Sequence, residues 1–345
     1  MVETSSLKET VLAPIHEEEG ARMGPFAGYR MPLTYAGTLA EHRAVREKAG
    51  IFDVSHMGQA LIRNPSVDRV LSRPLTSIPV GTGRYTLILN ADGGIVDDTF
   101  VYRLEESLWH IVVNASRKET DWKVLGEIEV LEDVAMIAIQ GPRVVPLLGE
   151  MCARRRFVRE TEVAGVNVRL LVRTGYTGED GYEAIVEKER AAELWRVLRR
   201  KEMEPCGLAA RDLLRIEAAL PLYGADIDET TRPHEVGLEF AVREPDRKGF
   251  VARDILSNPP PRRFRRCGIV GSAGPIPRRG ATILDAGGED VGVVTSGTFS
   301  PVLQAPIALG RIASSKQPAG VVIRGRKYSV KEAPLPFYRR ERNDG

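Results

Sequence analysis

The chain has 345 residues, of which 43% are hydrophobic and 28% are charged, and its formal net charge is +2. This length exceeds one simple hydrophobic core, so we expect two or three domains, and the mixed charges give no case for nucleic acid as the main partner. No apolar run approaches the ~20 residues of a membrane span and the N-terminus lacks the apolar core of a signal peptide, so we expect a cytoplasmic protein outside the membrane.

The first three quarters of the chain predict a mixture of helices and strands. Good helix formers at 38–49 precede Gly50, which suits the position just after a helix. Residues 191–200 and 208–220 have the spacing of amphipathic helices, and Pro221 stops the second. Apolar stretches between these helices predict strands at 86–89, 95–104, 108–113, 135–139 and 166–173.

The clearest boundary in the chain is Pro259-Pro260-Pro261, which can continue neither a helix nor a central strand. Short apolar runs separated by glycines and prolines follow at 268–270, 281–284, 291–295, 307–312 and 321–323. Many short strands with turn signals between them predict a sandwich or barrel, so residues from about 262 onward form a small all-β domain.

Several common catalytic motifs are missing from the sequence. It contains no complete dinucleotide or phosphate-binding glycine fingerprint, no Gly-x-Ser-x-Gly elbow and no His-Glu-x-x-His pair. Its five histidines lack ligand spacing, and its three cysteines lie far apart. We therefore expect no metal site and no disulfide framework. The missing motifs also argue against hydride transfer, phosphoryl transfer and serine hydrolysis.

Residues 89–102 predict a β-hairpin that carries two adjacent acids. Apolar residues flank the turn at 90–94, and side chains alternate in the second strand, so Asp97 and Asp98 point to opposite faces. The two carboxylates therefore cannot act together on one bond. At least one lies on an otherwise apolar face, where functional groups are enriched. The alternative is a structural hairpin in which both aspartates bond nearby amides.

Two further segments offer groups that could bind a ligand. The glycine-rich loop 174–182 carries Tyr176 and leads into Glu183, whose carboxylate could accept two donors from a guanidine-like edge. Arg211 lies in the first turn of the predicted helix 208–220, where an anion could dock. The structural alternatives are a plain glycine-rich turn and a simple ion pair.

Together and in this order, these segments resemble the aminomethyltransferase (T-protein) family of the glycine cleavage system. The resemblance covers most of the chain and rests on eight segments: 25–33, 50–57, 93–98, 136–142, 176–183, 210–212, 222–227 and 292–301. It departs from the family at 302–305, where a lysine-containing run is usual.

The resemblance implies an α+β fold of three domains in a cloverleaf around a folate cavity. Two α/β domains would be interleaved in sequence, the first formed by 1–55 with 135–225 and the second by 56–134 with 226–261. The third, 262–345, would be a C-terminal jelly roll or β-barrel, in agreement with the boundary at the triple proline.

The resemblance also implies a reaction and its residues. The methylene carbon of an aminomethyl group on the lipoyl arm of H-protein would pass to tetrahydrofolate, giving 5,10-methylenetetrahydrofolate and ammonia. Asp97 would be the catalytic acid, holding and polarising the reactive folate nitrogens. Glu183 would take the pterin edge and Arg211 the anionic side of the ligand. The other implied pocket residues are Met57, Tyr85, Asn114, Tyr176 and, at the C-terminus, Tyr338.

Two alternatives keep the folate site but change the function. A stand-alone folate-dependent demethylase would take its carbon from a small amine or sulfur compound. A non-enzymatic folate-binding protein of iron–sulfur cluster assembly would carry a Lys-Gly-Cys-Tyr motif, but Phe250 stands where the cysteine would be. A third alternative is a non-catalytic scaffold protein that binds no ligand. It would require a separate structural explanation for each of Asp97, Glu183 and Arg211.

Overall fold

The computed structural model describes residues 7–272 and 274–340, and the chain forms two compact units. The first unit is Met1–Pro65, Leu75–Tyr85 and Thr99–Asp212; the second is Ser66–Pro74, Thr86–Asp98 and Leu213–Gly345. The predicted mixed α/β fold with a C-terminal barrel is confirmed. The predicted boundaries of three domains stay a prediction.

A six-stranded sheet forms the centre of the first unit. Its strand order is β11 (Phe157–Val163), β12 (Val166–Val172), β13 (Gly181–Glu187), β10 (Val134–Gln140), β4 (Gly50–Asp53) and β14 (Glu204–Pro205). All neighbours are antiparallel except β14, which pairs with β4 in parallel.

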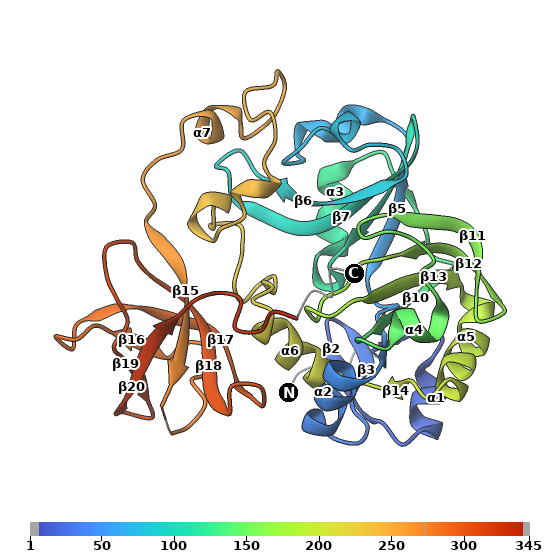
Figure 1. Ribbon diagram of the computed structural model, residues 1–345. Helices are drawn as coiled ribbons and strands as arrows, with labels where there is room; N and C mark the ends of the chain where they lie inside the picture. Colours follow the sequence, from blue (N-terminus) through green and yellow to red (C-terminus); the bar gives the residue numbers. More distant parts are fainter. Residues whose placement is uncertain (1–6, 273, 341–345) are drawn as a thin grey trace. The chain divides into compact units, whose positions relative to one another are not determined.

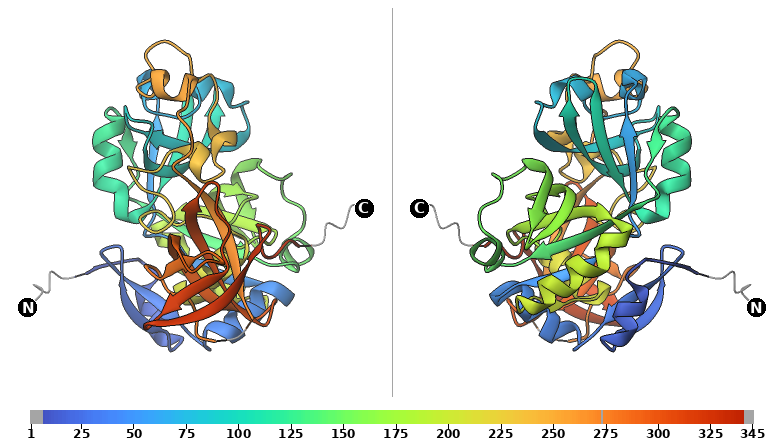
Figure 2. Two further views of the ribbon diagram at one scale, coloured as in Figure 1. Left: turned by 90° about the vertical axis from the view of Figure 1, so that its left-hand side faces the viewer. Right: turned by 90° about the vertical axis from the view of Figure 1, so that its right-hand side faces the viewer.

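One face of this sheet carries the largest core. Helix α5 (Lys188–Arg200) packs on β10, β12 and β13 and buries Leu194, Trp195 and Leu198 there (Figures 1 and 2). The short helices α1 (Ala13–Glu18) and α4 (Val144–Leu148) add Ile15 and Val144 to the same core. Because strand side chains alternate, the opposite face of the sheet remains available for other groups.

Two smaller sheets complete the strands outside the barrel. The order in one is β6 (Thr82–Leu89), β7 (Ile95–Glu105), β8 (Leu108–Val113), β5 (Gly58–Ile62) and β9 (Glu129–Val130). The order in the other is β1 (Lys8–Glu9), β3 (Tyr29–Thr34) and β2 (Arg22–Phe26). The predicted hairpin of 89–102 is therefore present as β6 and β7.

The C-terminal segment of the second unit is a closed six-stranded barrel. Its order is β15 (Phe264–Gly271), β18 (Ala305–Ala313), β17 (Asp290–Ser300), β16 (Thr282–Leu284), β19 (Gly320–Ile323) and β20 (Arg326–Ala333). Its core includes Ile269, Ile283, Val294 and Ile312. Strand β15 begins three residues after Pro261 and follows helix α7 (Arg253–Ser257).

Helix α6 (Leu208–Glu217) is tied to the barrel by a buried polar network within the second unit. The Arg215 guanidinium donates to the Asp226 carboxylate at 2.5 Å and to the Ser296 hydroxyl at 2.8 Å. Asp226 also accepts from Thr295 at 2.5 Å and from the Leu222 backbone N–H at 3.0 Å. Arg215 and Asp226 are both almost fully buried, so the network fixes the end of the helix against β17.

Two of the three predicted helices end earlier than expected, whereas α5 ends at Arg200 as predicted. Helix α2 (Thr38–Glu47) ends before residue 49, and α6 ends at Glu217 instead of 220. The α6 helix gives way to a turn because Ala219 has a φ of 53° and the Leu220 N–H donates back to the Arg215 carbonyl oxygen. The helix therefore ends ahead of Pro221, whose ring disfavours helix in the residue before it.

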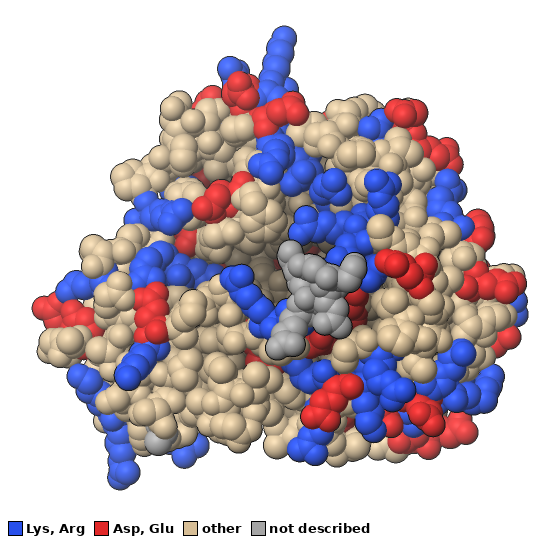
Figure 3. Space-filling view, viewed as in Figure 1, with Lys and Arg blue, Asp and Glu red and all other residues tan. Residues whose placement is uncertain are grey.

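The remaining elements are short. They are helix α3 (Lys118–Leu125) and 3-10 turns at Pro65–Arg69, Leu75–Ser77, Ala115–Arg117, Pro233–Glu235 and Glu239–Ala241. Among the residues that the structure describes, no helix is long and apolar enough to cross a membrane. Basic and acidic side chains are interspersed over the face seen in Figure 3.

Candidate functional site

The turn that precedes Asp97 is fastened by its own residues. The Asn90 side-chain oxygen accepts from the N–H groups of Asp92 and Gly94, at 3.1 and 2.8 Å. Its amide donates to the Glu229 carbonyl oxygen at 3.0 Å. A Cβ on Gly94 would lie 1.8 Å from that same oxygen, so only glycine fits. The start of β7 is thereby held firmly against residues 229–231.

Strand β7 turns the Asp97 side chain inward. Asp97 is 0% exposed, as is Ile95 on the same face, whereas Asp98 on the other face is half-buried. Burying a carboxylate among apolar side chains is unfavourable unless polar partners compensate. Of the two adjacent acids, Asp97 is therefore the one held away from water.

Glu183 lies on the sheet face opposite the large core of the first unit. It pairs with Ala138 of β10, which in turn pairs with Phe52 of β4, so Glu183 and Phe52 share a face. The next residue pairs, such as Tyr182 with Ile139, point into the core covered by α5. A carboxylate is thus presented from a rigid central strand.

Arg211 projects from the first turn of α6 and lies over two aromatic rings. Its guanidinium carbon is 4.9 Å from the ring centroid of Tyr176 and 6.0 Å from that of Phe52. Its Nη1 atom is buried and has no hydrogen-bond partner among the described residues. A buried, unbonded guanidinium nitrogen is unfavourable by itself, which makes it a candidate contact for a ligand.

Glu183 and Arg211 act on each other electrostatically. Burial raises the pKa of the Glu183 carboxyl above its usual range, and the positive charge of Arg211 opposes that shift. Burial lowers the pKa of Arg211, while Glu183 and Tyr176 raise it. The two side chains nevertheless form no hydrogen bond or ion pair with each other. They can therefore hold a ligand that offers donors to Glu183 and acceptors to Arg211.

The other predicted residues lie at different places. Met57 and Asn114 flank one end of the β5–β8 pair, because Gly58 pairs with Val113. Both are half-buried, and Tyr85 is half-buried on β6, all three in the first unit. Asp97 and Tyr338 belong to the second unit, where the Tyr338 N–H donates to the Glu217 carbonyl oxygen at 2.9 Å. The structure directly groups Glu183, Arg211 and Tyr176.

The sequence did not single out His56, although it adjoins the same cluster. His56 is 3% exposed, its Nδ1 atom has no hydrogen-bond partner among the described residues, and its ring centroid lies 5.5 Å from that of Phe26. Burial lowers its pKa to about 4, with further lowering by Arg211 and Lys118 and a rise from Asp53. The imidazole is therefore neutral at pH 7. In the sequence, His56 lies within the segment 50–57 that resembles the family and adjoins Met57.

Metal binding finds no support in the described part of the chain. Among residues 7–272 and 274–340, no group of three or more His, Cys, Asp or Glu side chains could hold a metal ion. Cys152, Cys206 and Cys267 are all free thiols.

The chain matches known families over nearly its whole length. Residues 12–245 match the family described as GCVT N-terminal domain, and residues 264–339 match the glycine cleavage T-protein C-terminal barrel domain.

Individual relatives agree with the family matches. An aminomethyltransferase of Rubrobacter xylanophilus is 40% identical over 99% of this chain and 97% of its own length. One of Symbiobacterium thermophilum is 38% identical over 97% of this chain and 98% of its own. A crystal structure of glycine cleavage system aminomethyltransferase T from Bartonella henselae superposes with a TM-score of 0.89 at 32% identity, covering 96% of this chain and 98% of that chain.

Proposed function

The chain belongs to the glycine cleavage T-protein family, and from this premise we propose that it transfers a one-carbon unit to tetrahydrofolate. Its curated relatives are aminomethyltransferases, and the chain is an enzyme of that class. In the proposed reaction, the methylene carbon comes from the aminomethyl group on the lipoyl arm of H-protein. Ammonia and the reduced arm are released, and 5,10-methylenetetrahydrofolate is formed.

The observation that carries this proposal is the Glu183–Arg211–Tyr176 cluster. A pterin presents a guanidine-like edge of N–H donors, which suits the buried Glu183 carboxylate. The unbonded Nη1 atom of Arg211 suits an acceptor or anionic group of the same ligand. Tyr176 adds a flat apolar surface beside Arg211. The residues present therefore fit a folate, with Glu183 on the pterin edge and Arg211 on its anionic side.

Tetrahydrofolate, when bound, supplies the nitrogen atoms that accept the carbon. We assign to Asp97 the task of holding and polarising those nitrogens by hydrogen bonding and charge. This role is positioning and electrostatic stabilisation, which requires a fixed carboxylate in a water-poor setting. The complete burial of Asp97 and the fastened turn before it support that assignment. Met57, Tyr85, Asn114 and Tyr338 are proposed to line the pocket.

Calorimetry tests the proposed folate site. Tetrahydrofolate is titrated into the wild-type protein and into Glu183→Gln, with Glu187→Gln, at the half-exposed end of the same strand, as the control. Loss of a charged acceptor is expected to weaken binding about tenfold to hundredfold in Glu183→Gln alone.

Aminomethyl-loaded H-protein is then added to the same cell and methylenetetrahydrofolate is measured. Binding with product formation supports the whole proposal. Binding without product retains the folate site and favours a demethylase or a non-enzymatic folate-binding protein. Absence of folate binding contradicts the proposal.

A further inference from the structure

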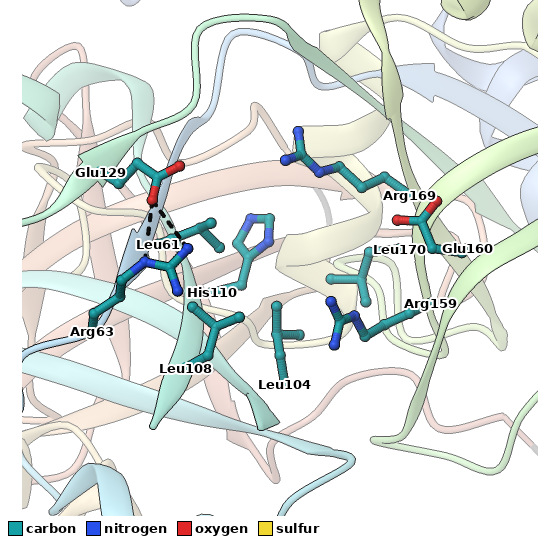
Figure 4. A pocket seen from close by; sticks show the side chains of 10 residues that line it. All are labelled: Leu61, Arg63, Leu104, Leu108, His110, Glu129, Arg159, Glu160, Arg169 and Leu170. Carbon is teal, nitrogen blue, oxygen red and sulfur yellow. Dashed lines mark hydrogen bonds and ion pairs between the residues drawn. The ribbon is translucent and has the colours of Figure 1, made fainter. Parts of the chain in front are cut away.

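A cavity of about 230 Å³ lies in the first unit, and none of the residues that line it is among those proposed for the folate site (Figure 4). Its apolar wall consists of four leucines, among them Leu108 on β8 and Leu170 on β12. Three arginines and two glutamates line the rest, so the lining carries one excess positive charge. The volume corresponds to roughly eight water molecules, which suits a small organic ligand.

A buried histidine stands in the middle of this cavity, as Figure 4 shows. His110 is 3% exposed, and its Nε2 atom lies 3.1 Å from the side-chain oxygen of Gln59. Burial and the charge of Arg169 lower its pKa to about 3, so the ring is neutral at pH 7. Its second ring nitrogen, Nδ1, has no hydrogen bond within the described residues and is available to a ligand.

Gln59 lets His110 offer either a donor or an acceptor at that nitrogen. The Gln59 side-chain nitrogen is buried and has no hydrogen-bond partner in the described part of the chain, so turning the amide over breaks no other hydrogen bond there. After that turn the amide would donate to Nε2, and the ring proton would move to Nδ1. His110 could then donate to an anion in the cavity while remaining neutral.

Of the three arginines that line the cavity, Arg169 has the weakest hydrogen bonding. Its Nη1 atom lies 3.9 Å from the Asp133 carboxylate and 3.5 Å from that of Glu187, within ion-pair distance of both, but it forms no hydrogen bond among the described residues. By contrast, Arg159 donates to Glu105 at 2.8 Å. An arginine with a spare donor beside a neutral histidine favours a carboxylate, which accepts several hydrogen bonds at once.

The backbone is distorted at the same place. Glu160 lies within β11 but has a φ of 43°, a left-handed conformation that is unfavourable for a residue with a side chain. The paired positions of β11 and β12 run from Arg159 with Leu170 to Thr161 with Val168, and the pair between them is interrupted. Strain of this kind concentrates at binding sites, and here it falls on the cavity rim.

We propose that this cavity is a binding site for a small aliphatic monocarboxylate. Its carboxylate would accept hydrogen bonds from Arg169 and His110, and its hydrocarbon chain would lie against the leucines. This inference is independent of the proposed folate site.

The test is a titration of the full-length protein, labelled with ¹⁵N at histidine, with sodium hexanoate. The His110 ring nitrogens are followed by NMR after assignment with His110→Gln. A saturable shift of His110 is expected with hexanoate, whereas hexanol and hexylammonium should produce none at equal concentration. The absence of a saturable shift, or equal shifts with hexanol, would overturn the proposal.

A pair of charge-matched variants tests the role of the arginine. Arg169→Gln removes the proposed carboxylate partner, and Arg196→Gln removes an exposed arginine of α5 whose nearest carboxylate lies 3.9 Å away. Arg169→Gln should weaken hexanoate binding by about tenfold or more, and Arg196→Gln should leave it unchanged. Equal affinities in the two variants would contradict the assignment of Arg169 even if hexanoate binds.

Discussion

Replacing Asp226 with alanine should destabilise the protein strongly, because the buried Arg215 guanidinium would lose the Asp226 carboxylate. Asp226 is 3% exposed and Arg215 is 2% exposed, so water cannot replace the lost partner. Removing one member of a buried ion pair typically costs about 3–5 kcal/mol. For a unit of this size that corresponds to a fall in Tm of roughly 6–20 °C.

The measurement is thermal unfolding of the full-length variant, with hydrogen exchange to identify the segments that open. Exchange should accelerate first in α6 and β17, the two elements that Asp226 joins through Arg215 and Thr295. Glu239→Ala is the control, because Glu239 and its partner Arg262 are both half exposed and such pairs contribute at most about 1 kcal/mol. Similar Tm values for the two variants would refute the reasoning.

The same carboxylate should also make stability depend on pH. Burial raises the pKa of Asp226, but the positive charge of Arg215 and the hydrogen bond from Thr295 together lower it by more than burial raises it. The pKa of Asp226 therefore lies below its usual range. Its contribution is therefore fully present above the unfolded pKa of about 3.9 and is lost as the pH falls below it. The wild-type protein should lose more stability than Asp226→Ala between pH 5 and pH 3; parallel losses would contradict this.

Three further outcomes are expected. Asp97→Asn should lower the transfer rate about 10²–10³-fold while tetrahydrofolate affinity stays within about threefold, and near-normal turnover in a stopped assay would show that the carboxylate is not needed. Gly94→Ala should lower the free energy of unfolding by about 3 kcal/mol, because the added Cβ would meet the Glu229 carbonyl oxygen. Gly287→Ala is the control and should be tolerated. Equal urea midpoints for the two variants would argue against a tight turn at Gly94. Tyr176→Leu should weaken tetrahydrofolate binding by about tenfold in calorimetry, and unchanged affinity would remove the ring from the site.

Local patterns in the sequence were enough to predict the elements with strong periodicity. The alternation around Asp97 predicted that at least one of the two acids lies on an otherwise apolar face, and on β7 Asp97 is buried and Asp98 is half-buried. The spacing of Leu194 and Leu198 predicted the buried face of α5. These predictions succeed because each depends on residues that are close in sequence and share one periodicity.

Elements that lack such a pattern were missed. Strand β20 is mostly polar, and only Val330 in it is buried, so closure of the barrel holds it in place more than its own sequence does. Strands β2 and β3 contain prolines, and their turn uses Ala27 at a φ of 48° and Gly28 at 80°. Alanine is rarely found with a positive φ, so the hairpin gave little turn signal.

The candidate site likewise contains residues that local sequence patterns predicted and residues that they did not. Glu183, Arg211 and Tyr176 were singled out by residue type and local setting, and the structure groups them. Phe52 and His56 lie more than 150 positions from Arg211 in sequence, and only the strand register and the packing of α6 bring them near it. No pattern within a short window contains that information.

The most direct test of the proposed function follows the carbon itself. H-protein loaded with a ¹³C-labelled aminomethyl group is mixed with tetrahydrofolate and the wild-type protein, and the label is followed by NMR while released ammonia is measured. The proposal predicts that the label appears in 5,10-methylenetetrahydrofolate with one ammonia for each carbon transferred. Label that stays on H-protein while tetrahydrofolate is bound would contradict it.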